Sequence, residues 1–99
     1  MSRHVPRSDR WSSHGPNQHR SLDGPVVRLY KGEWWAVVAY RLPVDGQDGP
    51  VTWQAHTDRL GPFRRPRNAM VEAERHVVAL RNRHGERFLL ERPSDSFTQ

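Results

Sequence analysis

The amino-acid sequence predicts an α+β protein in which a three-stranded antiparallel sheet packs on one C-terminal helix. Residues 25–57 are rich in β-branched and aromatic side chains and are broken by glycine turns, whereas residues 66–83 carry apolar side chains at helical spacing. The chain has 99 residues, the size of one small domain. We therefore expect a domain over residues 25–93, a disordered basic tail over 1–24 and a frayed C-terminus over 94–99.

The first two strands are predicted within PVVRLYKGEWWAVVAYRLP, which begins at Pro25. Lys31 and Gly32 separate two apolar runs, and a glycine suits the positive φ angle of a tight hairpin turn. These signals place strands over residues 26–30 and 33–42. The second strand is apolar in both of its alternating sets of side chains, so we expect it in the middle of the sheet.

A third strand is predicted over residues 51–57, after the loop PVDGQDGP. The two Asp-Gly pairs of this loop are typical of turns rather than of an acidic metal site. The side chains of the strand alternate between an apolar set and a polar set. The polar set should face solvent or a ligand, and it consists of Thr52, Gln54 and His56.

The helix is predicted over residues 66–83, after a turn at DRLGPF, with Pro66 suited to the first helical position and Gly85 to the stop. Its apolar stripe should pack on the sheet and consists of Ala69, Met70, Ala73, Val77 and Leu80. Val71 and Val78 lie off this stripe and need a second cover. Either residues 86–93 supply it, as a short fourth strand or an extended arm, or a subunit interface does.

The start of the helix carries charges of unfavourable sign. Arg64, Arg65 and Arg67 stand at the positive end of the helix dipole, where Ser, Thr, Asp and Glu are preferred. Together with the free N–H groups of the first turn, the arginines would suit a phosphate or another anion. The alternative is that their long side chains extend into water.

The composition excludes several classes of protein. The chain has no cysteine, which excludes disulfides and thiolate metal sites. Its six histidines lack the spacing of a zinc-binding pair on a helix, and no nucleophile elbow, P-loop or Rossmann glycine pattern is present. We therefore expect no enzyme, no metal and no cofactor. No apolar run has the length of a signal peptide or a membrane span, so we expect a cytoplasmic protein without membrane contact.

The charge balance favours a polyanionic partner. Sixteen Lys and Arg stand against eleven Asp and Glu, and the formal net charge is +5. A positive net charge of this kind favours polyanions such as nucleic acid or an anionic membrane surface.

The order of three strands and a helix, with an aromatic residue early in the second strand and Gly-Pro-Phe before the helix, resembles a known kind of DNA-binding domain. It is similar to the tyrosine integrase arm-binding regions and the plant AP2 factors over about two thirds of the chain. The residues that carry the likeness are Trp34 or Trp35, Tyr40, Trp53, Gly61, Pro62, Phe63, Ala69 and the EAER of residues 72–75. The resemblance implies that the exposed sheet face enters the major groove of DNA. The helix departs from the family pattern because it lacks a Ser or Thr cap and early acids.

Carried over to this sequence, the resemblance and the period-two spacing give one candidate face. It consists of Arg28, Tyr30, Trp35, Arg41, Thr52, Gln54 and His56, with Arg64, Arg65 and Arg67 as additional phosphate contacts. A shift of one residue in the second strand would exchange Trp35 and Arg41 for Trp34 and Tyr40.

The functional hypothesis is a small non-enzymatic protein that binds nucleic acid, with duplex DNA favoured over RNA. The alternative is a protein interaction module or a homodimer without any nucleic-acid role. The two hypotheses differ in salt dependence, because phosphate contacts weaken steeply with ionic strength and apolar interfaces do not.

Overall fold

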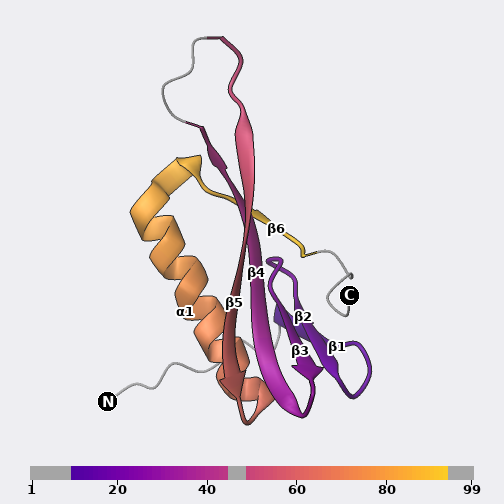
Figure 1. Ribbon diagram of the computed structural model, residues 1–99. Helices are drawn as coiled ribbons and strands as arrows, with labels where there is room; N and C mark the ends of the chain where they lie inside the picture. The colour runs from indigo at the N-terminus through magenta and orange to yellow at the C-terminus, as the bar shows by residue number, and fades with distance from the viewer. Residues whose placement is uncertain (1–9, 45–48, 94–99) are drawn as a thin grey trace, which may run out of the picture.

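The computed structural model describes residues 10–44 and 49–93, and in them one helix packs on one antiparallel six-stranded sheet (Figure 1). The α+β class is confirmed, although the sheet has six strands rather than three. The strands are β1 (Trp11–Ser13), β2 (Gln18–Ser21), β3 (Val26–Tyr30), β4 (Glu33–Pro43), β5 (Trp53–Phe63) and β6 (Leu89–Glu91). The helix is α1 (Pro66–His84), and a short 3-10 turn (Gly85–Arg87) leads from it to β6.

Strand β4 lies at the centre of the sheet. Strand β5 pairs along one of its edges, from Pro43↔Trp53 to Trp34↔Phe63. Two strands share the other edge end to end, because β3 pairs with residues 33–37 and β6 pairs with residues 39–41. Beyond β3 lie β2 and then β1. The prediction of a central strand that is apolar on both faces is therefore confirmed.

The hydrophobic core lies between α1 and one face of the sheet. The predicted helical stripe is confirmed, because Ala69, Ala73, Val77 and Leu80 are buried and Met70 packs against them. From the sheet, Val27, Ala36, Val38 and Tyr40 meet this stripe, and Phe88 closes the core after the helix. Val27 and Val38 are fully buried.

The ends of α1 agree with the sequence signals. Pro66 occupies the first helical turn, and Gly85 ends the helix with a φ angle of 62°. The N-cap residue is Arg65, its side chain makes no capping hydrogen bond, and the first turn contains no acidic residue. Within the described ranges, no helix is long and apolar enough to cross a bilayer.

Residues 10–24 differ from the expectation of a disordered tail, because they form β1 and β2. Their contacts are polar or aromatic: Trp11 Nε1 donates to Glu74 Oε2 over 2.8 Å, and the His19 ring lies 5.6 Å from that of Trp34. Contacts of this kind do not require apolar residues at regular spacing, so the sequence shows no periodic pattern from which β1 and β2 could be predicted. Residues 1–9 and 94–99, also predicted to be disordered or frayed, and the 45–48 loop lie outside the described residues.

Strand β5 differs from the prediction in length. The segment DRLGPF was expected to form a turn, but β5 continues through it to Phe63. The pairing with β4 shifts by one residue between Trp34 and Ala36, which places a β-bulge at Gly61 and Pro62, opposite Trp35. Pro62 lies in this bulge, where the regular pairing with β4 is already interrupted, so its missing N–H group removes no regular pair.

The expected fourth strand after the helix is present as β6, but it does not cover the valines that lie off the helical stripe. Leu90 of β6 packs into the core, while Val78 stays 54% exposed. Val78 instead borders a pocket that is also lined by Trp11 and Pro25. Of the two covers that the sequence left open for Val78, the C-terminal segment does not supply one, and the subunit interface stays a prediction.

The turn between β2 and β3 offers a test of how β6 is held. Gly24 has a φ angle of 126°, and a Cβ atom there would lie 2.6 Å from the carbonyl oxygen of Glu91. We expect Gly24→Ala to lower the free energy of unfolding by about 2 to 4 kcal/mol, because it adds a clash to backbone strain. The control is Gly15→Ala, with a φ angle of 90° and open space around it, which should cost about 1 kcal/mol. Urea denaturation measures both, and equal losses would contradict the packing of β6 on this turn.

Candidate nucleic-acid interface

One face of the sheet points away from α1. Along β4, the side chains of Trp34, Ala36, Val38 and Tyr40 pack toward the helix, so the alternate residues point to the opposite side. Residues paired directly across strands share a face, which extends this assignment to the neighbouring strands. We call this surface the outer face, and it consists of Ser12, Gln18, Arg20, Val26, Arg28, Tyr30, Glu33, Trp35, Val37, Ala39, Arg41, Pro43, Trp53, Ala55, Thr57, Arg59, Leu89 and Glu91.

Four of the predicted site residues lie together on the outer face. Arg28 pairs with Trp35, Tyr30 lies two residues along the same strand, and Arg41 lies further along β4. The alternative register is excluded, because Trp34 and Tyr40 pack on the helix side.

The three predicted residues around β5 do not join this face. Gln54 and His56 are opposite Leu42 and Tyr40, which places them on the helix side. The His56 ring stacks on that of Tyr40, with 5.3 Å between the centroids. Thr52 precedes β5, and its carbonyl oxygen accepts a hydrogen bond from the N–H group of Val44. The polar set was predicted to face solvent, and Thr52 and Gln54 are exposed, but Gln54 and His56 lie on the helix side rather than on the outer face.

Two valines on the outer face are buried although no helix covers them. Val26 and Val37 are each 3% exposed, and they are paired with each other. Across the neighbouring strands they are flanked by Arg20 on one side and Arg59 on the other. We infer that the aliphatic stems of these arginines, together with Trp35, cover the valines.

A row of side chains across β2, β3 and β4 contains two hydrogen-bond donors without acceptors. Gln18, Arg28 and Trp35 are adjacent by register. Gln18 Nε2 and Trp35 Nε1 are buried and have no hydrogen-bond partner within the described part of the chain. Both atoms are donors, and a buried donor without an acceptor destabilises the fold by about 1 to 3 kcal/mol. Two buried donors of this row are therefore left without an acceptor from the described part of the chain.

Sequence reasoning missed three residues of this surface. Gln18 and Arg20 lie in the segment predicted to be disordered, and Arg59 lies in the segment predicted to be a turn. The alternation of Gln18 and Arg20 about His19 was the available signal, but a four-residue strand is too short to distinguish from loop.

The remaining charges on the outer face are partly balanced. Arg41 Nε lies 3.0 Å from a carboxylate oxygen of Glu91, so this arginine already has an acidic partner. Lys31 Nζ lies 5.3 Å from the centroid of the Tyr30 ring, and Glu33 is opposite Tyr30.

The three helix-start arginines lie at the same end of the sheet as the Gln18–Arg28–Trp35 row. Arg64 follows Phe63, which pairs with Trp34, the neighbour of Trp35. The bulge also approaches Trp35 closely, because a Cβ atom at Gly61 would lie 3.1 Å from the indole ring. Among the described residues, the side chains of Arg64, Arg65 and Arg67 are exposed and make no hydrogen bond or ion pair.

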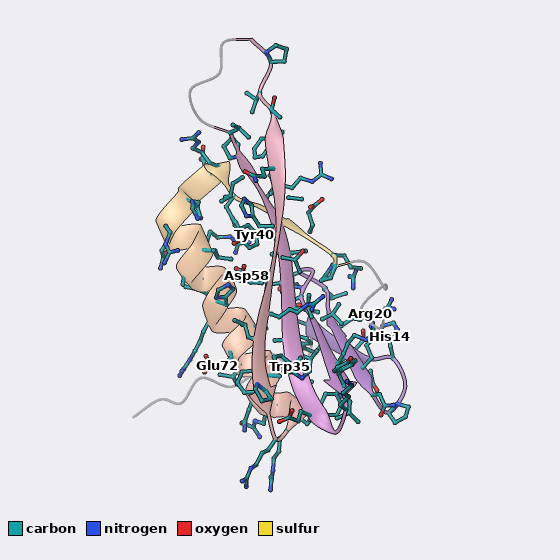
Figure 2. The ribbon with its side chains drawn as sticks, in the orientation of Figure 1. His14, Arg20, Trp35, Tyr40, Asp58 and Glu72 are labelled. Carbon is teal, nitrogen blue, oxygen red and sulfur yellow. The ribbon has the colours of Figure 1, made fainter. Side chains whose placement is uncertain are left out.

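A second polar cluster lies on the helix side, between the long strands and α1 (Figure 2). Tyr40 Oη donates to Asp58 Oδ2 over 2.9 Å, and His76 Nε2 lies 2.7 Å from the same oxygen. Burial, and then the bond to Asp58, raises the pKa of Tyr40 above its ordinary value. This cluster joins the sheet to the helix. Within residues 10–44 and 49–93, no group of three or more His, Asp or Glu side chains is placed to hold a metal.

His19 also lies on the helix side of the sheet, opposite Val27. Burial lowers the pKa of His19, so this ring is a poor cation at neutral pH.

Comparison of the chain with protein-family models, with curated proteins and with solved structures finds no match. The resemblance to integrase arm-binding and AP2 domains therefore stays a prediction, and the functional conclusion depends on the surface itself.

The Tyr40 cluster makes a testable prediction about pH. Tyr40 is one of two tyrosines, so Tyr30→Phe leaves it as the only phenol. We expect an absorbance titration to give Tyr40 a pKa above 10.0, and we expect Asp58→Asn to lower that pKa. Because folding favours the neutral phenol, its stabilising contribution is present below pH 10.0 and is lost as pH rises through the raised pKa. Titration at the ordinary value would contradict the buried contact.

Proposed function

We propose that this protein is not an enzyme and binds nucleic acid, most favourably duplex DNA, through the outer face. The observation that carries the proposal is the row formed by Gln18, Arg28 and Trp35. Two buried donors without acceptors flank a cation in this row. A polyanion that also carries neutral acceptor atoms satisfies both needs at once.

The chemistry of DNA matches these groups. Phosphate oxygens accept hydrogen bonds from amide, indole and guanidinium donors, and arginine binds phosphate or guanine with two parallel bonds. Arg20 and Arg59 flank the buried valines in the adjacent row of the same face. These arginines supply charge. Trp35 and Gln18 supply directional donors once their side chains turn toward the ligand, because both donor atoms are buried in the free protein.

The dimensions of the sheet fit a duplex whose major groove holds only part of the sheet. Strands lie about 4.8 Å apart and the major groove of B-DNA is about 12 Å wide, so it admits two strands and not five. The β4–β5 hairpin extends beyond the end of α1 (Figure 1). We place this hairpin in the groove and the β2–β3 side of the outer face on the flanking phosphates.

Duplex DNA is favoured over RNA for a geometric reason. The major groove of A-form RNA is deep and narrow and does not admit a sheet. The outer face also exposes two aromatic rings, Tyr30 and Trp53, each 37% exposed, which suit stacking on unpaired bases. A single strand is therefore the informative comparison ligand.

The helix-start arginines fit the same partner. Arg64, Arg65 and Arg67 oppose the dipole of α1 and replace the usual cap. A phosphate at the free N–H groups of the first turn would balance both the dipole and the arginines. This contact accounts for a local feature that otherwise destabilises the helix.

A second candidate function is a protein interaction module, which the apolar end of the outer face favours. Trp53 and Leu89 lie on this face and are 37% and 45% exposed, and the neighbouring Val51 is 64% exposed. An interface built on these side chains would be nearly indifferent to salt.

The first experiment is fluorescence anisotropy of a labelled duplex of random sequence and of a matched single strand, titrated at several salt concentrations. We expect duplex binding whose logarithm falls linearly with the logarithm of salt concentration. Arg28→Gln should lower the slope by about 1 and weaken binding, as expected for one lost phosphate contact. The matched control is Arg83→Gln, in the last turn of α1, which should change binding little. Absence of duplex binding at low salt would contradict the proposal.

The helix start is tested separately. Replacing Arg64, Arg65 and Arg67 with Glu should lower the salt slope by about 3, since each phosphate contact contributes about 0.9. Arg83→Glu, which lowers the net charge by 2 where the triple variant lowers it by 6, reports the effect of a charge change away from the helix start. If the triple variant binds like the wild type, the arginines do not contact phosphate, even where the Arg28 result supports the outer face.

A further inference from the structure

Strand β5 presents a long unpaired edge. It has 11 residues and pairs with β4 on one side, and in the described ranges no strand pairs with its other side. The strand β1, at the opposite end of the sheet, has three residues. Natural sheets usually keep exposed edges short or block them, because an open edge pairs with another chain. An edge of this length therefore points to a partner strand.

We propose that the partner is β5 of a second copy of this chain, paired antiparallel about a two-fold axis through Thr57. In that register, residues 53–61 of one copy pair with residues 61–53 of the other. Three independent features of the strand lead to this register.

The first feature is the alternation of faces. We take the two copies to form one continuous sheet with both helices on the same side. Each residue of β5 that faces the helix in one copy must then pair with a residue that faces the helix in the other copy. An antiparallel pair meets this condition when the axis passes through a residue rather than between two residues.

The second feature is charge. An axis through Asp58 or Arg59 would place that residue opposite its own copy, and like charges directly opposite each other are destabilising. With the axis at Thr57, His56 faces the partner's Asp58 and Arg59 faces the partner's Ala55. No like charges then face each other across the new strand pair.

The third feature is the position of Pro62. Strand β5 begins at Trp53, and the span that is symmetric about Thr57 ends at Gly61. The next residue, Pro62, lacks the N–H group that pairing needs. The longest span that starts at the first residue of β5 and avoids the proline is therefore centred on Thr57.

A groove beside this edge accommodates polar side chains of β5 that lie on the helix side of the sheet. Between β5 and α1 lies a pocket lined by Leu60, Phe63, Arg75, His76 and Ala79, among others. The proposed register places the partner's Gln54 opposite Leu60, at this groove. The polar side chains of Gln54 and His56 then lie in an interface rather than on a solvated surface.

This inference does not rest on nucleic-acid binding. It predicts a dimer in the absence of any ligand, and it would stand if the protein bound no DNA. It also joins the two outer faces into one continuous surface.

The test uses the absence of cysteine from the chain. Opposite Cα atoms in an antiparallel pair lie about 4.5 to 5.5 Å apart, within the range of a disulfide. In air, the Thr57→Cys variant should form a disulfide-linked dimer faster than Ser12→Cys, which places a thiol on the same face at the opposite end of the sheet. Wild-type protein should approach twice the chain mass of 11.6 kDa in light scattering as its concentration rises.

A charge variant keeps the test independent of thiol chemistry. Thr57→Lys places two ammonium groups opposite each other at the axis, so it should shift the mass toward the monomer, whereas Ser12→Lys should not. A monomeric wild type at every concentration overturns the proposal. Equal crosslinking of the two cysteine variants, or equal masses of the two lysine variants, also overturns it.

Discussion

The packing of β4 is the constraint on which the rest of the structure depends. Its side chains are apolar on both faces, and five consecutive residues, Ala36 to Tyr40, are buried. A strand of this kind needs a cover on each face and a partner on each edge. Helix α1 covers one face, β5 fills one edge, and β3 and β6 divide the other. The joint between β3 and β6 in turn fixes the turn at Gly24.

The second face of β4 explains why arginines gather where they do. The chain supplies one helix, so Val37 and its partner Val26 must be covered by neighbouring side chains. Arginine and tryptophan can do this, because they combine a large apolar body with a polar end. The side chains that flank these valines thus include donors that are themselves buried, Trp35 Nε1 and Arg20 Nε. Stability and the proposed binding role follow from one arrangement.

Sequence reasoning could predict the elements that contribute apolar side chains to the core. The hairpin, the helix with its stripe and the assignment of Trp35 and Arg41 to the outer face all followed from patterns of apolar residues, since burial is what creates a period. β1 and β2 were missed because they are held by contacts such as that from Trp11 to Glu74. Such a contact joins residues that are far apart in the sequence, and no local pattern records it. The end of β5 was missed because glycine and proline mark bulges as well as turns.

The placement of Gln54 and His56 shows a different limit. The alternation in β5 was predicted, but the assumption that polar residues face away from a helix failed. Strand β5 lies at the edge of the sheet, where the helix side also carries polar groups, including Asp58. The face of an edge strand is set by its register with the central strand, which sequence alone does not specify.

The distribution of acidic residues bears on why the outer face would attract a polyanion. Asp58 is held by Tyr40 and His76, Glu72 by Arg75 and Glu74 by Trp11, and all of these contacts lie on or beside α1. Among the described residues of the outer face the acids are Glu33 and Glu91, and Glu91 pairs with Arg41. Acids that are engaged on the helix side do little to screen arginines on the other side of the sheet. Among the described residues, the outer face and the helix start therefore carry more arginines than acids, which is the charge distribution that the proposed binding requires.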